Sequence, residues 1–156
     1  MRAILSLAFI MLLVNTTKAQ PVPVKMRQLG SYFYIDKGGA QKLKNGVNYF
    51  VISDRKSFEK LFGRMSRADT PQFSKELVVM MVMPASKRES TLKFERVSMK
   101  AGDYLEVYCG QDLYHHKVNY EMNAVAVAAI PRAAGTKKVI FYDQYMRKLE
   151  TLEIDD

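Results

Sequence analysis

The side chains best suited to chemistry in this sequence are one cysteine and the two histidines that follow it. Cys109 is the only cysteine, and His115 and His116 are the only histidines. A thiol and an imidazole so close in sequence could act as a nucleophile and its base. In the strand predicted for residues 104–109, however, Cys109 alternates in phase with two apolar residues, which predicts a buried, unreactive thiol. The sequence also lacks a G-x-S-x-G nucleophile elbow, so we expect no catalytic residues.

Metal binding is the second chemistry that these residues could support. His115 and His116 are adjacent, and adjacent residues on a strand point to opposite faces, which disfavours joint ligation of one ion. Methionines at positions 80, 81 and 83 suggest copper, yet a strand divides them between two faces, and no histidine accompanies them. The acidic residues are dispersed and form no calcium loop. We therefore expect neither a metal ion nor a cofactor.

Exposed tyrosines offer a binding surface instead. Six tyrosines, at positions 32, 34, 104, 108, 114 and 120, cannot all fit inside a domain of this size. A surface tyrosine combines contact area with a hydroxyl group, although cross-strand aromatic pairing is the alternative interpretation. Two of the tyrosines flank the histidine pair, and a predicted loop around residues 87–89, which could also carry recognition, contains two basic residues. The predicted partner contact consists of Tyr114, His115, His116, Lys117 and Tyr120, with Lys87 and Arg88 as further candidates.

The elements that position these side chains are mainly short strands. β-prone runs separated by turns predict strands at residues 32–36, 47–52, 77–83, 91–99, 104–109, 113–118, 121–130, 139–145 and 149–154. Ser53 is the predicted cap of one helix, because Phe58, Leu61, Phe62 and Met65 then share one face.

Two of these runs predict more than strand location. Residues 77–83 are apolar without interruption, which is typical of a central strand covered on both faces. In residues 91–99 the apolar residues change phase halfway, and a one-residue β-bulge near Glu95 and Arg96 would return them to one face. The chain is therefore assigned to the α+β class, mainly antiparallel β with about eight or nine strands and one amphipathic helix. We expect a compact sandwich or a partly closed barrel.

The N-terminus predicts export. Arg2, the apolar run at residues 3–14 and Ala19 together are typical of a signal peptide over residues 1–19, cleaved after Ala19. The run is too short to span a membrane, since a spanning helix needs about 20 apolar residues. Prolines at positions 21 and 23 predict a flexible arm over residues 20–28, leading into a single β-rich domain at 29–156. We expect a soluble protein in the periplasm or the medium.

Charge and composition limit the classes of partner that we expect. The formal net charge is +8, and it falls to +6 when the signal peptide leaves with its two basic residues. The remaining lysines and arginines are scattered rather than clustered in a run, so we expect no nucleic-acid binding. With a single cysteine no intramolecular disulfide can form, and the fold must depend on its hydrophobic core.

The order of elements resembles the PrcB-like domain, named for a small exported subunit of a bacterial surface protease complex. The resemblance covers residues 47–142 and rests on the capped helix at 53–62, the buried run that follows residue 73, the hairpin at 92–107 and the segments 129–131 and 139–141. Members of that family commonly carry Gly-Gly-Tyr before the first hairpin strand, where this chain has residues 88–91 without glycine. The family is not known as enzymatic, and the resemblance implies a protein-binding role, such as stabilising or restraining a protease.

The sequence therefore predicts an exported, non-enzymatic binding domain whose partner is another exported or envelope protein. Binding of a small molecule, a glycan or an envelope polymer in a cleft beside the helix is the alternative. An enzyme with an unrecognised site is the third possibility.

Overall fold

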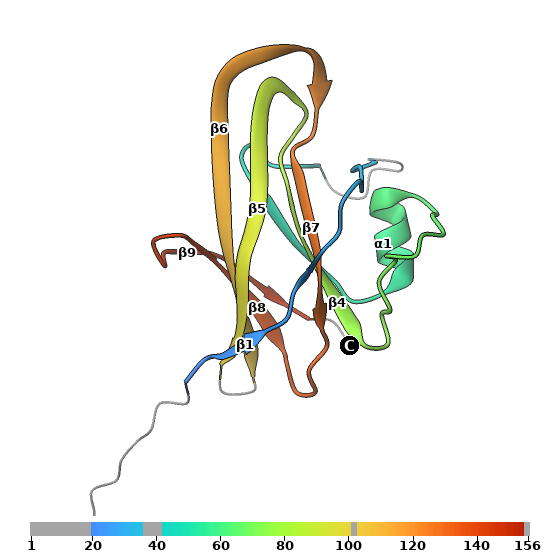
Figure 1. Ribbon diagram of the computed structural model, residues 1–156, viewed down its shortest axis with the longest axis vertical. Coiled ribbons are helices and arrows are strands. Elements are labelled where there is room, and N and C mark those ends of the chain that lie inside the picture. The colour runs from blue at the N-terminus through green and yellow to red at the C-terminus, as the bar shows by residue number, and fades with distance from the viewer. Residues whose placement is uncertain (1–19, 36–41, 101–102, 155–156) are drawn as a thin grey trace, which may run out of the picture.

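The chain folds as a two-layer β-sandwich with one helix packed outside it, in a computed structural model that describes residues 20–35, 42–100 and 103–154 (Figure 1). The elements are β1 (Val22–Val24), β2 (Arg27–Gln28), β3 (Asn48–Ile52), α1 (Arg55–Phe62), β4 (Glu76–Val82), β5 (Ser86–Lys100), β6 (Tyr104–Met122), β7 (Val125–Pro131), β8 (Lys138–Asp143) and β9 (Lys148–Glu153). One sheet has the order β1-β5-β6-β8-β9 and the other β2-β7-β4-β3. The predicted class is confirmed, and the sandwich is the form that it takes.

β4 is the central strand that the uninterrupted apolar run predicted. It pairs antiparallel with β3 on one side and with β7 on the other. Its side chains alternate between two cores, one between the sheets and one under α1. All six apolar residues at 77–82 are at most 1% exposed. A strand buried on both faces needs apolar residues at every position, and this is the pattern that the sequence has.

The helix is shorter than predicted, and its cap lies one residue later. The Asp54 carboxylate accepts a hydrogen bond of 2.9 Å from the Ser57 N–H group, so Asp54 caps the helix and the prediction of Ser53 is wrong. The helix ends at Gly63, whose φ of 79° is easily adopted only by glycine. Met65 therefore lies beyond the helix. The buried face of α1 still packs against the sheet that contains β4.

The predicted β-bulge is present in β5. Phe94 lies opposite Cys109 and Arg96 lies opposite Tyr108, so Glu95 is the extra residue. The bulge brings Leu92, Phe94 and Val97 to the same inner face, where all three are buried.

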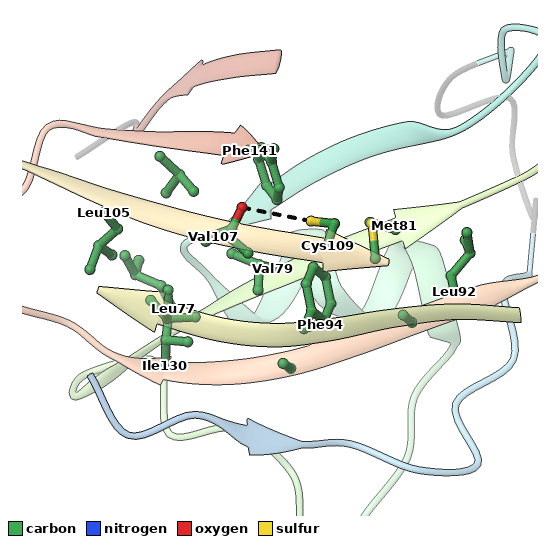
Figure 2. Close-up of a cluster of buried hydrophobic side chains, with 14 of the residues drawn as sticks. Leu77, Val79, Met81, Leu92, Phe94, Leu105, Val107, Cys109, Ile130 and Phe141 are labelled. Carbon is green, nitrogen blue, oxygen red and sulfur yellow. Dashed lines mark hydrogen bonds between the residues drawn. The ribbon is translucent and has the colours of Figure 1, made fainter. Parts of the chain in front are cut away.

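Cys109 also lies in this core. Figure 2 shows it beside Phe94 and Met81, with its thiol directed at the Val107 carbonyl oxygen 3.8 Å away. The side chain is 5% exposed, as its strand parity predicted.

β5 and β6 are longer than predicted. β6 runs unbroken from Tyr104 to Met122, whereas the sequence predicted one strand up to Cys109 and another from Leu113. Gly110 does not end the strand. It lies opposite Lys93, and a Cβ atom there would come 3.1 Å from Lys93 Cγ and overlap Lys93 Cε. The glycine therefore admits the lysine side chain that crosses it.

β6 also pairs in parallel with β8, over residues 104–109 and 138–143. The chain between them crosses to the other sheet as β7 before it returns. The sequence predicts β8 as a strand but contains no local signal for this pairing, since the partners lie more than thirty residues apart.

The N-terminal segment differs most from expectation. The flexible arm predicted over residues 20–28 is replaced by two short edge strands, β1 on β5 and β2 on β7. Pro23 is tolerated because an edge strand needs hydrogen-bond donors on one side only. Arg27 holds β2 in place through two hydrogen bonds of 2.9 and 3.0 Å to the Glu76 carboxylate. The predicted signal peptide lies outside the described residues.

Residues 32–35 are not a strand, contrary to the prediction for 32–36; residue 36 lies outside the described part. Ser31 has a φ of 59°, which interrupts the extended chain after β2. The segment then packs against α1, where the Ile35 N–H group donates a hydrogen bond of 2.8 Å to the Leu61 carbonyl oxygen. Packing on the helix has overridden the alternating pattern.

Candidate functional site

The β5–β6 ribbon, defined here as residues 86–94 and 110–122, extends beyond the rest of its sheet. β1 pairs with β5 only at residues 97–99, and β8 pairs with β6 only at 104–109. Among the described residues, the ribbon part of β5 therefore pairs only with β6, and the ribbon part of β6 pairs only with β5. Figure 1 shows both strands rising above β8 and β9 before the chain turns into β7. The ribbon therefore exposes both faces and both outer edges over much of its length.

The ribbon carries all of the predicted contact residues. Tyr114, His115, His116, Lys117 and Tyr120 belong to β6, and Lys87 and Arg88 belong to β5. Residues 87 and 88 were expected in a loop, but they lie in a strand because β5 begins at Ser86.

Several of these residues lie close together on the ribbon, either across it or along β6. Lys117 lies directly opposite Arg88, and the Tyr114 and His116 rings are 5.9 Å apart at 48°. The imidazole Nε2 of His116 contacts the Glu89 carboxylate. The structure thus gathers residues 87–89 and 114–117 at one place on the ribbon.

Irregular pairing shapes this end of the ribbon. Between the pairs Ser90–Leu113 and Arg88–Lys117, Glu89 alone faces three residues of β6. A further register shift precedes the pair Ser86–Met122. Extra residues on one strand bend it and increase its twist, so β6 curves around β5 before it reaches β7.

The charges on the ribbon are unbalanced locally. Arg88 and Lys117 are exposed like charges on directly opposed positions, an arrangement that destabilises a strand pair. Lys87 is exposed beside them, and none of the three forms an ion pair within the described part of the chain. Glu89, the nearest carboxylate in sequence, already contacts His116. This end of the ribbon therefore presents a basic rim.

A groove of about 630 Å³ lies beside the ribbon. Its walls are the segments 31–34, 90–92 and 120–125. Three large apolar side chains on these walls are exposed: Phe33 at 75%, Tyr120 at 57% and Met122 at 41%. Leu113 and Tyr114 are exposed on the adjoining part of the ribbon. The groove therefore gathers exposed large apolar side chains among polar ones, including Glu121, and the basic rim of the ribbon lies beside it.

The wall formed by residues 31–34 is anchored by Tyr32. The Tyr32 ring is buried edge-on against Phe58 and Phe62, with ring centroids 5.3 and 5.5 Å apart. Its hydroxyl donates to Asp69 Oδ1 at 3.3 Å. Burial raises the pKa of the Tyr32 hydroxyl, so it stays protonated as a donor at neutral pH.

Arg67 fixes the same wall from outside. Its guanidinium lies 4.6 Å from the Tyr32 ring centroid and donates to the Gly30 and Ser31 carbonyl oxygens at 3.0 and 2.9 Å. The hydrogen bond from Arg67 to Asp69 lowers the pKa of that carboxyl group, which keeps it charged and paired. The chain is thus anchored at residues 30–32 and again where the Ile35 N–H group donates to Leu61, and the Phe33 ring between these anchors is exposed to solvent.

Sequence reasoning missed Phe33, Leu113 and Met122. A signal for Phe33 was available, because three consecutive aromatic residues in an extended segment cannot all face the same side. Met122 gave no such signal, since it resembles any core methionine until the fold places it at the strand end. Leu113 gave no such signal either, since a leucine in a predicted strand at residues 113–118 resembles an ordinary core residue.

The structure separates the residues that could have made a catalytic pair. Burial raises the pKa of the Cys109 thiol to about 12, so at neutral pH it is protonated. Cys109 lies in the core between the sheets, whereas His116 lies on the exposed ribbon and contacts Glu89. Among the described residues, no group of three His, Cys, Asp or Glu side chains is arranged to hold a metal ion. In the same part of the chain, no helix is long and apolar enough to cross a membrane.

Comparison with protein families, curated proteins and solved structures finds no match to this chain.

Proposed function

We propose that this protein is an exported binding domain that recognises another exported or envelope protein through the groove and the ribbon beside it. The observation that carries the proposal is where the exposed large apolar side chains lie. Of nine in the described residues, three line the groove, Phe33, Tyr120 and Met122, and two more, Leu113 and Tyr114, lie on the ribbon beside it. Concentrated exposed apolar side chains mark interaction sites, and aromatic residues and methionine are enriched at protein interfaces.

The anchoring of the groove wall supports this role. Phe33 would lose little conformational freedom on binding, because Tyr32 and Arg67 already hold the backbone on which it stands. Side chains presented by a fixed backbone bind at a lower entropic cost than side chains on a flexible loop. The basic rim adds attraction to an acidic partner and would speed association.

The PrcB-like pattern in the sequence supports a protein partner, since the family is named for a subunit of a protease complex. The predicted signal peptide supports a partner outside the cytoplasm. A role in stabilising or restraining a protease is the more specific form of the proposal.

Partner capture from an envelope and secreted fraction tests the proposal, with the purified chain as bait and chemical crosslinking to retain weak complexes. Phe33→Ser and Tyr120→Ser remove aromatic contacts from the groove without touching the core. Tyr145→Ser is the matched control, because Tyr145 is 71% exposed at the turn between β8 and β9. We expect a specific protein that the wild type and the control retain and the groove variants lose.

Two outcomes would contradict the proposal. In the first, every captured protein is retained equally by the groove variants and the control. In the second, no protein is captured and the chain is instead retained by a glycan or envelope polymer in a manner that depends on Phe33 and Tyr120. The second outcome would favour a glycan-binding module with the same groove.

A further inference from the structure

The groove lies where the β5 edge has no partner strand. β1 covers that edge at residues 97–99 only, and over 90–94 no described strand replaces it. The Phe94 carbonyl oxygen is turned to this edge, where it accepts a hydrogen bond of 3.0 Å from Gln28 Nε2. Because alternate residues of a strand direct their backbone groups to the same edge, the N–H and C=O groups of Ser90 and Leu92 also point outward.

The facing edge of β7 is open at the same level. Met83 donates its N–H to the Ala124 carbonyl oxygen at 2.9 Å, so Ala124 faces β4 and Val125 faces away from it. The Leu29 N–H group donates to Val127 at 2.9 Å, and β2 has no described residue opposite Val125. Both edges, which have no partner strand at this level among the described residues, therefore border the groove, whose walls include residues 90–92 and Val125.

The N-terminal segment cannot cover these edges in this conformation. After Leu29 the chain turns at Ser31, and the Arg67 guanidinium holds the Gly30 and Ser31 carbonyl oxygens against the α1 side. In Figure 1 this segment leaves the sheet edge toward α1. Unpaired backbone groups beside exposed apolar side chains form a template for an added strand.

The basic rim adjoins the same groove. A small hollow lined by Ser86, Arg88, Ser90, Met122 and Ala124, among others, shares the last three of these residues with the groove. It therefore connects the apolar walls to Arg88, which faces Lys117 across the ribbon without a carboxylate partner in the described chain. An occupant with carboxylates at this end would relieve the repulsion between the two cations.

We propose that the occupant is an extended peptide segment of a partner protein, which adds as a strand to the β5 edge at residues 90–94. The inference rests on the proposed protein-binding function and names its mode. The peptide runs antiparallel to β5, as β1 does, so its C-terminal end reaches Arg88. Alternate apolar side chains contact Phe33, Tyr120 and Met122, and acidic residues follow them in the peptide sequence.

Selection from a displayed library of random peptides with the purified chain provides the first test. We expect selected peptides with apolar residues at alternate positions, followed by Asp or Glu. Selected peptides with helical spacing of apolar residues, or no binding peptide at all, would overturn the proposal.

The selected peptide, made synthetically, tests the backbone pairing. N-methylation at two residues that face β5 should weaken binding at least about tenfold, because two hydrogen bonds are lost, whereas N-methylation at the intervening residues should matter less. The amide protons of Ser90 and Leu92 should exchange more slowly in the complex. Equal affinity for the two methylated peptides would overturn strand addition.

Substitutions in the chain provide the matched control. Ser90→Pro removes an outward N–H group without removing a bond to β6, and Ser90→Ala retains that group. We expect the first variant to lose the peptide and the second to bind it, with thermal unfolding measured to show that both are folded. Arg88→Glu should weaken binding of the acidic peptide and strengthen binding of a peptide that has Lys in place of its acidic residues.

The two proposals fail separately. If Phe33→Ser abolishes partner capture but Ser90→Pro leaves both partner and peptide binding unchanged, strand addition is wrong and protein recognition stands. If Ser90→Pro is unfolded, the paired methylated peptides on the wild-type chain decide the question.

Discussion

The Cys109 thiol gives a quantitative test of the core between the sheets. Burial raises its pKa from 9.0 to about 12, with a smaller contribution from the Glu95 carboxylate. At pH 8 the thiolate is therefore about a thousandfold less populated in the native protein than in the unfolded chain. Reaction with a chromogenic disulfide reagent should be slower by at least about that factor in the native state, since only the thiolate attacks. A native rate within about tenfold of the unfolded rate would refute the buried position.

The same shift predicts how stability depends on alkaline pH. Below pH 9 both the folded and the unfolded chain hold the thiol proton, and the contribution of Cys109 is fully present. Between pH 9 and about 12 only the unfolded chain loses this proton, so the free energy of unfolding decreases as pH rises. From pH 8 to pH 11 the wild type should lose about 2.5 kcal/mol more than Cys109→Ala does.

Urea unfolding of both proteins at each pH measures this difference. Other groups titrate in the same range, but they are common to both proteins and cancel in the comparison. The alanine variant starts from a lower stability, because it leaves a small cavity, and that offset should not depend on pH. Parallel pH profiles for the two proteins would show that the thiol ionises alike in both states and would contradict its burial.

Two further predictions concern the helix cap and the bulge. Asp54→Ala should lower the free energy of unfolding by about 1 kcal/mol at neutral pH, with Lys56→Ala as control. The hydrogen bond from Ser57 lowers the Asp54 pKa, so the difference should vanish as pH falls below 3.8 and on through the lower folded value. Deleting Glu95 should lower the free energy of unfolding by more than about 4 kcal/mol, because either Leu92 and Phe94 or Val97 and Met99 must then face solvent. Glu95→Ala keeps the bulge and should remain folded; a stable deletion variant would show that the register adapts.

Local signals were enough for much of the fold. The apolar run at 77–83 predicted a central strand, and the phase change in residues 91–99 predicted the bulge at Glu95. Both predictions depend only on which side chains along one strand must avoid water. Because successive side chains of a strand point to opposite faces, that requirement fixes which face each residue occupies. The burial of Cys109 followed from the same alternation.

Local signals failed where contacts with distant segments decide the conformation of the chain. The proline-containing segment at 20–28 was expected to be loose, but β5 and β7 offer edges to which it pairs. Gly110 was expected to interrupt a strand, but it accommodates Lys93 from the neighbouring strand. In both cases the deciding contact comes from a residue in a different segment of the chain. The strand propensity of the local residues therefore could not predict it.

The sequence by itself determined the burial of residues 77–82 and of Cys109, because that burial follows from the local pattern of apolar side chains along one strand. It also determined which tyrosines, histidines and cations could serve as contacts. Only the tertiary structure decided that residues 87–89 meet 114–117 on one ribbon and that Phe33 and Tyr120 line the same groove. It also decided which part of the β5 edge has no partner strand among the described residues. These are consequences of strand order and register, and such long-range pairing is specified by the packing of the whole core rather than by any one segment.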